Sequence, residues 1–218
     1  MQRTPEPELM TDAEQVAAYA GADFEAPHSR YVELLRERLP RLPRAGTAVD
    51  IGSGPGDITC RLARALPQWQ LLGLDGSEPM LEYAREAARR MGLESRVQFH
   101  LCRLPSASAP EVGYDLLCSN SLLHHLAEPM HLWQAVLRWS KPESAVFVMD
   151  LMRPSSEAAA RQLVEEYSSN EPEVLRRDFY NSLLAAYRPD EIREQLDRAG
   201  LNRLRVEVVS DRHWLVAS

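Results

Sequence analysis

Short apolar runs alternate with longer segments of helical periodicity through the middle of the chain. Five of these runs have the length and residue types of strands: 47–51, 70–75, 97–101, 114–120 and 145–151. Between several of them, apolar residues recur at every third or fourth position, which predicts helices. Strands and helices that alternate over short connections favour a parallel, doubly wound sheet.

The helices expected between the strands have recognisable ends. Ser77 is a candidate N-cap for the helix that follows the second strand, and Gly92 is expected to end that helix. The helix before the fifth strand is predicted to bury one face, which carries Met130, Trp133, Val136 and Leu137.

Two further helices are predicted before the first strand. The first begins near Thr11, a candidate N-cap with Glu14 three residues later, and ends near Ala20. The second covers 29–39, where four apolar residues share one face: Tyr31, Leu34, Leu35 and Leu39. A proline-containing break then separates this part from the first strand.

After residue 151 the pattern becomes helical, with Ser155 as a candidate N-cap and a helix over 189–199. Two last apolar runs, 203–209 and 213–217, are joined by a short link and predict an antiparallel hairpin at the sheet edge. The fold class expected is therefore α/β, with a mostly parallel, doubly wound sheet of seven strands and a C-terminal antiparallel hairpin.

Composition and charge narrow the functional class. The chain has 218 residues, of which 44% are hydrophobic and 26% charged, as in ordinary globular proteins. A net charge of −7 is unfavourable for a general nucleic-acid binder, so no nucleic-acid partner is expected. The sequence leaves the oligomeric state open.

The three cysteines, Cys60, Cys102 and Cys118, are widely spaced and are expected to be free thiols of a reducing compartment. The first ten residues contain no apolar stretch typical of a signal peptide, and no apolar run is long enough to span a bilayer. A cytoplasmic protein without a membrane partner is the expectation. No Cys/His cluster has metal-ligand spacing, so no metal site is predicted.

The most informative stretch follows the first strand, where Asp50 precedes three glycines within five positions: Gly52, Gly54 and Gly56. In a doubly wound sheet, ligands bind at the carboxyl ends of the strands. Glycines there let the backbone approach a ligand, and the following helix offers unpaired N–H groups. The loop is therefore the expected ligand site.

Two ligand classes compete for this loop. A dinucleotide favours the spacing G-x-G-x-x-G, whereas this loop has G-x-G-x-G and an acidic residue where a diphosphate would be repelled. A carboxylate at Asp50 suits a ligand with an ammonium or sulfonium group. Asp75, at the end of the second strand, can accept both hydrogen bonds of a ribose diol. A nicotinamide-dependent oxidoreductase is thus disfavoured.

Three stretches together resemble class I S-adenosylmethionine-dependent methyltransferases of the small-molecule type: VDIGSGPG, LLGLDGSEPML and YDLLCSNSLLHHL. The resemblance covers about residues 45–150. It implies S-adenosylmethionine as the cofactor and a small-molecule methyl acceptor as the partner, with in-line displacement at the sulfonium methyl.

The resemblance also implies which residues bind the cofactor. The loop from Gly52 to Gly56, including Ser53 and Gly54, would hold the methionine part, with Asp50 near its amino group. Asp75 and Gly76 would lie at the ribose and Met80 at the adenine, whereas Asn120 would face the methyl donor. Many relatives carry an acidic residue after the third strand, where this chain has Cys102 and Arg103. Arginine offers no acceptor, so either backbone groups of Arg103 and Leu104 hold the adenine or Arg103 points away.

Acceptor-side residues are less defined by the sequence. His124 is a candidate general base and substrate contact because an imidazole titrates near neutral pH. Packing or capping of a helix is the competing interpretation of His124, and the favoured one for its neighbour His125. Ser121, Tyr19 and Tyr180 are further candidate substrate contacts. Packing of a helix is the alternative role of Tyr19, and capping of a helix is that of Tyr180.

A single methyltransferase domain over 1–218 follows from this interpretation. Its expected parts are a helical lid (1–44), a cofactor-binding core (45–151), a helical insert for the acceptor (152–190), and a last helix and hairpin (191–218). Two alternative functions stay open. One is an enzyme that modifies the cofactor or transfers another group, and the other is a non-catalytic, cofactor-binding regulatory subunit.

Overall fold

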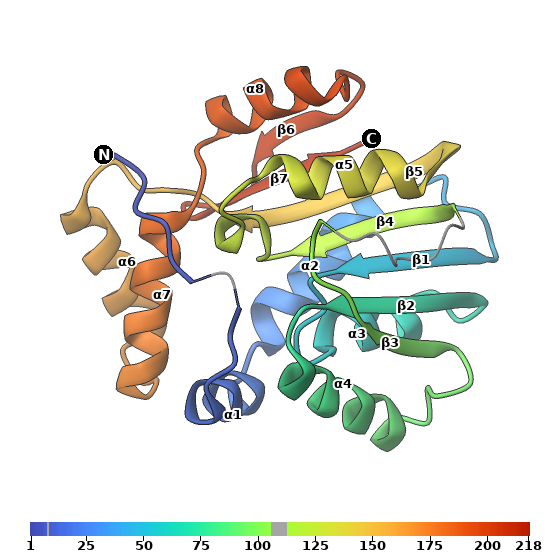
Figure 1. Ribbon diagram of the computed structural model, residues 1–218, viewed down its shortest axis with the longest axis horizontal. Coiled ribbons are helices and arrows are strands. Elements are labelled where there is room, and N and C mark those ends of the chain that lie inside the picture. The colour runs from blue at the N-terminus through green and yellow to red at the C-terminus, as the bar shows by residue number, and fades with distance from the viewer. Residues whose placement is uncertain (8, 106–112) are drawn as a thin grey trace.

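The computed structural model describes residues 1–7, 9–105 and 113–218, and its centre is a seven-stranded sheet (Figure 1). The strand order is β3-β2-β1-β4-β5-β7-β6. The strands are β1 (Gly46–Ile51), β2 (Trp69–Asp75), β3 (Val97–Leu101), β4 (Tyr114–Asn120), β5 (Ser140–Leu151), β6 (Arg205–Val208) and β7 (His213–Ala217). Strands β1 to β5 are parallel, and β7 runs antiparallel to both β5 and β6. The α/β class, the doubly wound sheet and the C-terminal hairpin are confirmed.

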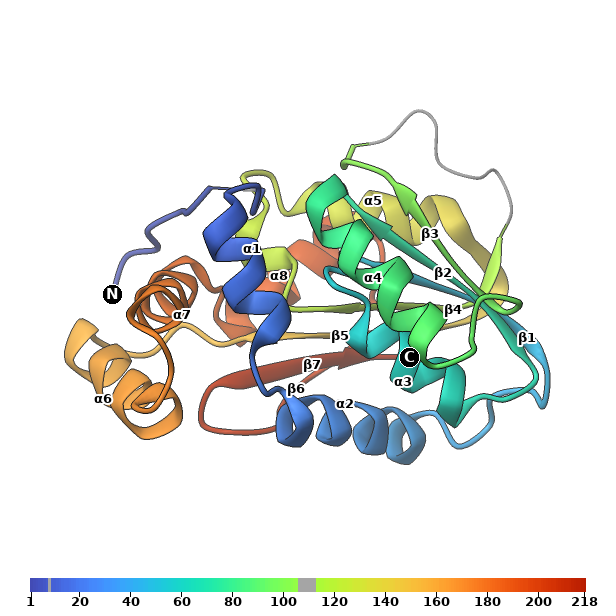
Figure 2. The ribbon, with the colours of Figure 1, turned by 90° about the horizontal axis from the view of Figure 1, so that it is seen from below.

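Helices cover both faces of the sheet (Figures 1 and 2). On one face lie α2 (Glu25–Arg38), α3 (Asp57–Ala65) and α4 (Glu78–Arg90), and on the other lie α5 (Met130–Trp139) and α8 (Pro189–Ala199). Three helices lie beyond the carboxyl ends of the strands: α1 (Ala13–Gly21), α6 (Glu157–Ser168) and α7 (Glu173–Ala185). A short 3₁₀ helix, η1 (Leu123–His125), follows β4.

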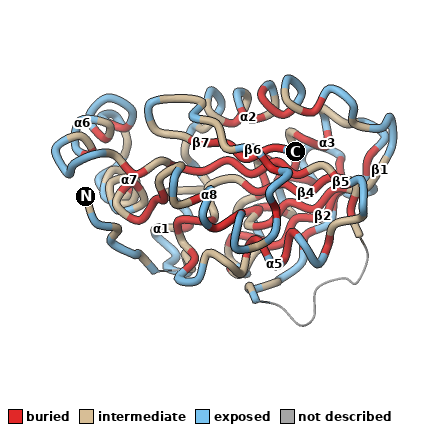
Figure 3. Tube along the Cα trace, turned by 90° about the horizontal axis from the view of Figure 1, so that it is seen from above, coloured by how far each residue is buried: buried red, intermediate tan, exposed pale blue. Residues whose placement is uncertain are grey.

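Alternation along the strands builds two core layers. In β1, Ala48 packs with α2 and α3, whereas Val49 and Ile51 pack with the helices of the opposite face. In β5, Phe147 packs in the same layer as Ala48, and Val148 packs in the layer of Val49 and Ile51. A strand with apolar residues on both faces is buried on both, and Figure 3 shows the central strands as buried. Strand ends that emerge from this core are therefore held in fixed positions.

Several predicted helix ends shift by one to four residues. The N-cap of α1 is Asp12 rather than Thr11, and its carboxylate accepts from the N–H of Gln15 at 3.0 Å. Ser156, not Ser155, caps α6. Both pairs place two good capping residues side by side, so sequence alone does not decide between them. Helix α2 begins at Glu25, four residues before the predicted start.

Two other expectations were wrong in detail. Leu137 of α5 is 47% exposed, although it was expected on the buried face with Trp133. Ser77 stands at the N-cap position of α4, but its hydroxyl makes no cap bond. It donates instead to the carbonyl of Met10 at 2.7 Å, which attaches the N-terminal segment to the end of β2. Within the described part of the chain, no helix is both long and apolar enough to cross a membrane.

Candidate functional site

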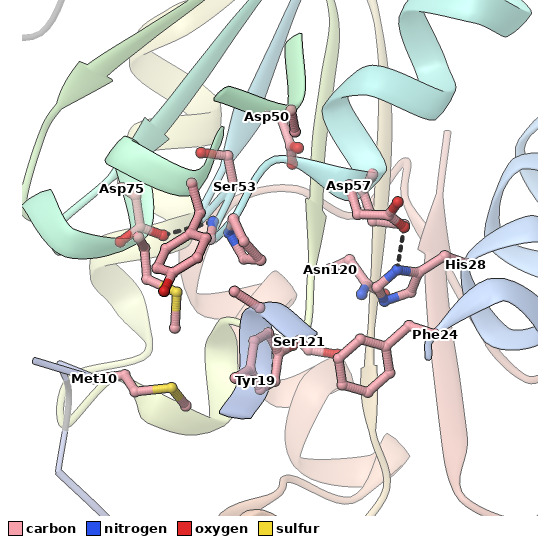
Figure 4. Close-up of a pocket in the computed structure, with 18 of the residues that line it drawn as sticks. Met10, Tyr19, Phe24, His28, Asp50, Ser53, Asp57, Asp75, Asn120 and Ser121 are labelled. Carbon is pink, nitrogen blue, oxygen red and sulfur yellow. Dashed lines mark hydrogen bonds and ion pairs between the residues drawn. The ribbon is translucent and has the colours of Figure 1, made fainter. Parts of the chain in front are cut away.

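A cavity of about 290 Å³ opens at the carboxyl ends of β1, β2 and β4 (Figure 4). This position is the switch point of the sheet, because the chain order reverses between β1 and β4. The glycine loop and the N-terminal end of α3 form one side, and α1 with the start of α2 forms the other. The volume is at the lower end of the range for small-molecule sites, about 300–1,000 Å³.

The glycine loop is shaped by its backbone. Gly52 has a φ of 77°, and a Cβ atom there would lie 2.8 Å from Cδ1 of Leu122. Gly54 also has positive φ, and its N–H donates to Asp75 at 2.8 Å. Gly52, Ser53 and Gly54 line the cavity, but Gly56 does not. A Cβ on Gly56 would meet Ala84 and Phe99 at 2.8 Å, so this glycine allows α3 to approach α4.

Asp50 brings a buried carboxylate to the cavity wall. It is 2% exposed, and its Oδ2 accepts a hydrogen bond from Thr59 at 2.5 Å. Its Oδ1 is buried and has no hydrogen-bond partner among the described residues. Burial, and secondarily the charge of Asp75, raises the pKa of Asp50 to about 7 despite the Thr59 bond. A cationic N–H donor in the cavity would satisfy this oxygen.

Asp75 is held rigidly at the end of β2. Its Oδ2 accepts from the N–H of Gly54 and its Oδ1 from the N–H of Ser77, both at 2.8 Å. Burial raises the pKa of Asp75, and these backbone bonds oppose that shift. Each carboxylate oxygen keeps a further lone pair, so the side chain can also accept hydrogen bonds from a diol.

The residues expected at the ribose and the adenine divide between two neighbouring cavities. Gly76 and the buried Met80 line the main cavity, whereas Arg103 and Leu104 line a smaller one of about 40 Å³. The two cavities share Asp75 and Gly76 at the end of β2. A Cβ on Gly76 would lie 2.7 Å from Leu9, which also lines both cavities. The N-terminal segment therefore covers this region.

An aromatic group from the N-terminal helices faces the glycine loop (Figure 4). The rings of Tyr19 and Phe24 lie 4.9 Å apart, and Phe24 stacks on His28 at 5.0 Å. Nδ1 of His28 lies 2.6 Å from Oδ2 of Asp57, the first residue of α3. All four residues line the cavity. Burial raises the pKa of Tyr19 to about 12, so its hydroxyl stays protonated.

Asp57 also binds Arg61. Nε of Arg61 donates to Oδ2 of Asp57 at 2.7 Å, and both guanidinium NH₂ groups bind Glu25. Burial works to raise the pKa of Asp57, but the hydrogen bonds from His28 and Arg61 outweigh it and hold this pKa below its usual value. The carboxylate is therefore charged at neutral pH and can fix the orientation of the His28 ring.

Asn120, the last residue of β4, and Ser121, the residue after it, both line the cavity. Ser121 has a φ of 54°, a backbone conformation that a non-glycine residue rarely adopts. Its N–H donates to the carbonyl of Met149 at 3.0 Å, which holds this conformation. Such local strain is typical of residues placed at ligand sites.

His124, the predicted general base, does not line the cavity. It is 3% exposed, and its Nδ1 lies 2.5 Å from Oδ1 of Asp150 at the end of β5. Burial lowers the pKa of His124, but the charge of Asp150 outweighs it and raises this pKa above its usual value. His125, expected to pack or cap, is the histidine of this pair that lines the cavity. Burial lowers its pKa to about 3, so it is neutral.

Tyr180 is placed away from the cavity. It lies on α7, and its hydroxyl donates to Glu157 of α6 at 3.3 Å. Arg161 of the same helix lies over its ring. The side chain therefore belongs to the contact between α6 and α7, and this placement argues against the substrate contact that the sequence suggested.

His28, Phe24 and Asp57 line the cavity, although the sequence analysis did not single them out as site residues. Asp57 directly follows the last glycine of the loop, so the sequence could have identified it as a candidate site residue. His28 lies 29 residues earlier on another helix, and periodicity alone does not show that α2 meets α3.

The comparisons with known proteins agree on one family. A family model described as a methyltransferase domain matches residues 44–200. A trans-aconitate 2-methyltransferase of Azoarcus sp. (strain BH72) is 32% identical over 132 residues, which are 60% of this chain and 49% of that protein. A 27-O-demethylrifamycin SV methyltransferase of Amycolatopsis mediterranei (strain S699) is 26% identical over 190 residues, 87% of this chain and 65% of that protein.

The fold is similarly shared. A crystal structure of a SAM dependent methyltransferase from Aquifex aeolicus has a TM-score of 0.69 at 19% identity and covers 95% of this chain and 98% of that one. The chain spans between about half and two thirds of the length of the two curated relatives described above. The family model, by contrast, matches more than half of this chain, including the whole glycine loop and all strands of the cavity.

Proposed function

The chain belongs to the methyltransferase-domain family, and from that premise we propose that it transfers the methyl group of S-adenosylmethionine to a small-molecule acceptor. The observation that carries this proposal is the pair of acidic residues at one cavity. Asp50 presents a buried oxygen without a partner among the described residues, and Asp75 presents a rigid carboxylate one strand away. An ammonium group and a ribose diol are what these two positions fit.

The residues at the cavity fit the cofactor from end to end. Asp50 and the backbone of Gly52–Gly54 would bind the amino-acid part, Asp75 the ribose, and Met80 with Gly76 the base. Arg103 and Leu104 line the adjoining small cavity and are the proposed further contacts of the base. When bound, the cofactor supplies a methyl group on a positively charged sulfur, which is electrophilic without further activation by the protein.

The work left to the protein is to exclude water, orient the acceptor and take up its proton. His28 is the residue placed for the last step. Its Nδ1 is engaged by Asp57, and its Nε2 has no hydrogen-bond partner in the described part of the chain. With Nδ1–H donating to the charged carboxylate, Nε2 is the proton-accepting atom. His28 thus takes the place first expected for His124.

Charge at the cavity restricts the acceptor. Among the described lining residues are five acids, Asp23, Glu25, Asp50, Asp57 and Asp75, and two arginines, Arg61 and Arg90. Arg61 is already bound by Asp57 and Glu25. A polycarboxylate such as trans-aconitate, the compound named for one relative, would meet net repulsion here. We therefore propose a neutral or cationic acceptor with an aromatic or apolar part that packs on Tyr19 and Phe24.

The test is formation of S-adenosylhomocysteine from S-adenosylmethionine in the presence of fractionated metabolite extracts. We expect turnover that depends on one fraction, with the radiolabelled methyl group recovered in a small product. Anionic and cationic fractions should be separated first, because the proposed acceptor lies outside the anionic one. Tight cofactor binding without turnover in any fraction would support a non-catalytic subunit instead, and a changed mass of the bound nucleoside would support cofactor modification.

A cytoplasmic location and the absence of nucleic-acid partners remain predictions from the sequence. The net charge of −7 is the property that supports the second of them. Binding of a labelled nucleic-acid duplex at low salt would contradict it, because general binding of nucleic acid is strongest there.

A further inference from the structure

Three potential metal ligands meet where the N-terminal segment contacts η1. They are Oε1 of Glu6, Nε2 of His124 and Nδ1 of His125, and the ligand atoms of these residues lie within 4.8 Å of one another. Glu6 and His124 are 118 positions apart in sequence, so the fold alone creates this group. The methyl-transfer proposal assigns no role to Glu6 or His124.

The separations between Glu6 and the two histidines fit a tetrahedral metal ion. Oε1 of Glu6 lies 3.5 Å from Nε2 of His124 and 3.2 Å from Nδ1 of His125. Four ligands at the bond lengths of zinc, roughly 2.0–2.1 Å, are separated from each other by about 3.3 Å. The two separations of Glu6 from the histidines lie close to that value. Neither contact has the geometry of a hydrogen bond, although both are within ion-pair distance.

The orientation of His124 supports the same interpretation. Its Nδ1 lies 2.5 Å from Oδ1 of Asp150, which directs Nε2 toward Glu6. The backbone N–H groups of Leu123 and Leu151 donate to the same aspartate, at 2.6 Å each. An imidazole that gives one N–H to a fixed carboxylate and presents its other nitrogen is the usual arrangement of a metal-binding histidine.

A second, independent observation comes from His125. Its Nδ1 is a buried atom that has no hydrogen-bond partner within the described residues. The rings of His124 and His125 lie 4.2 Å apart, and each has a nitrogen within ion-pair distance of the same carboxylate oxygen. Glu6 is held in place by the hydroxyl of Ser182 on α7, which donates to its Oε1 at 3.0 Å. An orphaned ring nitrogen next to an anchored carboxylate is explained by a bound cation.

We propose that Glu6, His124 and His125 form a binding site for one divalent transition-metal ion, with Zn²⁺ as the best match. Two imidazoles and one carboxylate are a known ligand set for zinc, and three protein ligands leave one position of a tetrahedron for water or a ligand atom. Because Glu6 belongs to the N-terminal segment and His125 lines the main cavity, the ion would fasten that segment at the edge of the cavity.

The test is a zinc titration of the full-length chain, freed of metal with a chelator, in competition with a chromogenic zinc indicator. We expect one tight Zn²⁺ per chain. Loss of a partner outside the ligand set typically weakens a metal site about 10- to 100-fold, which is the effect expected for D150N. The ligand variants E6Q and H125Q should weaken binding further still. Co²⁺ in place of Zn²⁺ should give the visible absorption of a four-coordinate site, and H125Q should abolish it.

His100→Gln is the matched control, because His100 is an exposed histidine of β3 away from this group. It should bind zinc like the parent chain, and circular dichroism should show every variant folded. Zinc binding that E6Q and H125Q leave unchanged, or no stoichiometric binding by the parent, would establish an ion-pair cluster only. Binding of S-adenosylhomocysteine, measured on the same samples, is independent of this result and reports on the proposed function separately.

Discussion

At the scale of single residues, Asp50 is a buried carboxylate whose charged form is destabilised by burial. Its folded pKa of about 7 lies above the model-compound value of 3.8 because the carboxylate is buried. The folded chain therefore retains a proton that the unfolded chain loses between these two values. The stability that this proton supports is fully present below pH 3.8 and is lost as the pH rises through about 7.

Asp50→Asn should consequently be more stable than the parent chain above neutral pH and nearly equal to it in acid. The gain should amount to a few kcal/mol, since one pKa unit corresponds to about 1.4 kcal/mol. Denaturant unfolding at a series of pH values measures it. Asp115→Asn is a control that should change the unfolding free energy in the opposite direction, by destabilising the folded chain at neutral pH. Lys141 and Thr47 outweigh the effect of burial and hold the pKa of Asp115 below its usual value. Equal unfolding free energies of D50N and the parent above pH 7 would contradict the claim that the buried charge of Asp50 destabilises the folded chain.

His28→Gln should lower kcat for the acceptor found by the turnover assay about 10²- to 10⁴-fold, the usual range for a lost general base. The affinity for S-adenosylhomocysteine should not change. Asp57, Arg61 and Glu25 are the charged groups next to His28, and the variant leaves all three in place. His100→Gln serves as the control. A proportional loss of kcat and cofactor affinity would instead indicate a structural role.

Residues at strand ends were predictable, whereas residues brought together by the tertiary fold were not. Asp50, Gly52, Asp75 and Asn120 follow from the positions of three strands, because parallel strands end at one edge of the sheet. His124 was assigned to the cavity because it follows β4, but Asp150 turns it toward Glu6. The contact of His28 with Asp57 depends on how α2 packs on α3, which no local pattern encodes.

At the scale of elements, the ligand site depends on the backbone conformation of the loop between β1 and α3. Gly52→Ala combines a positive φ with a Cβ contact of 2.8 Å to Leu122, whereas Gly54→Ala has positive φ and nothing within 4 Å. G54A should cost about 1–2 kcal/mol of unfolding free energy, the price of a left-handed alanine. G52A should cost clearly more, because Leu122 must also move.

Denaturant unfolding of the two glycine variants, at the same pH, measures this difference. The pair isolates the contact with Leu122, since both glycines lie in one loop and both have positive φ. Equal losses of stability would show that the loop relaxes away from Leu122 and that its backbone is not fixed by the end of β4.

Helix ends show how far element boundaries follow from sequence. The one-residue shifts at Thr11 and Ser155 occurred where a second capping residue is adjacent. The early start of α2 at Glu25 includes Pro27 in its first turn, a position where proline is tolerated because its missing N–H has no helical partner there. Element order and strand pairing were robust to these shifts, because burial on two faces fixes the strands.

At the scale of the whole molecule, the N-terminal segment joins the sheet, η1 and α7. The guanidinium of Arg3 donates to the carbonyls of Ala185 at 2.5 Å and His124 at 2.8 Å, and it lies over the ring of Tyr187. Leu9 then lies against Gly76 at the cavity. Closure of the cavity therefore depends on contacts far from the glycine loop.

Arg3→Ala should release the N-terminal segment and speed dissociation of S-adenosylhomocysteine. Hydrogen bonds from a charged group are worth about 1.5–3 kcal/mol each. Without them, the backbone N–H groups of the segment should lose most of their protection from hydrogen exchange. Hydrogen exchange over residues 1–12, with and without the ligand, measures it. Arg177→Ala is the control, since Arg177 is exposed and pairs only with the adjacent Asp178 in the described contacts. Unchanged exchange in R3A would show that other contacts hold the segment.

The most direct test of the account is calorimetric titration of the parent chain and of Asp75→Ala with S-adenosylmethionine, S-adenosylhomocysteine and NAD. Both adenosyl compounds should bind the parent, whereas NAD should not. D75A should bind them at least about tenfold more weakly, because the ligand loses its hydrogen bonds to the carboxylate of Asp75. Binding of NAD alone, or equal affinity of D75A and the parent for the adenosyl compounds, would contradict the assignment of this cavity.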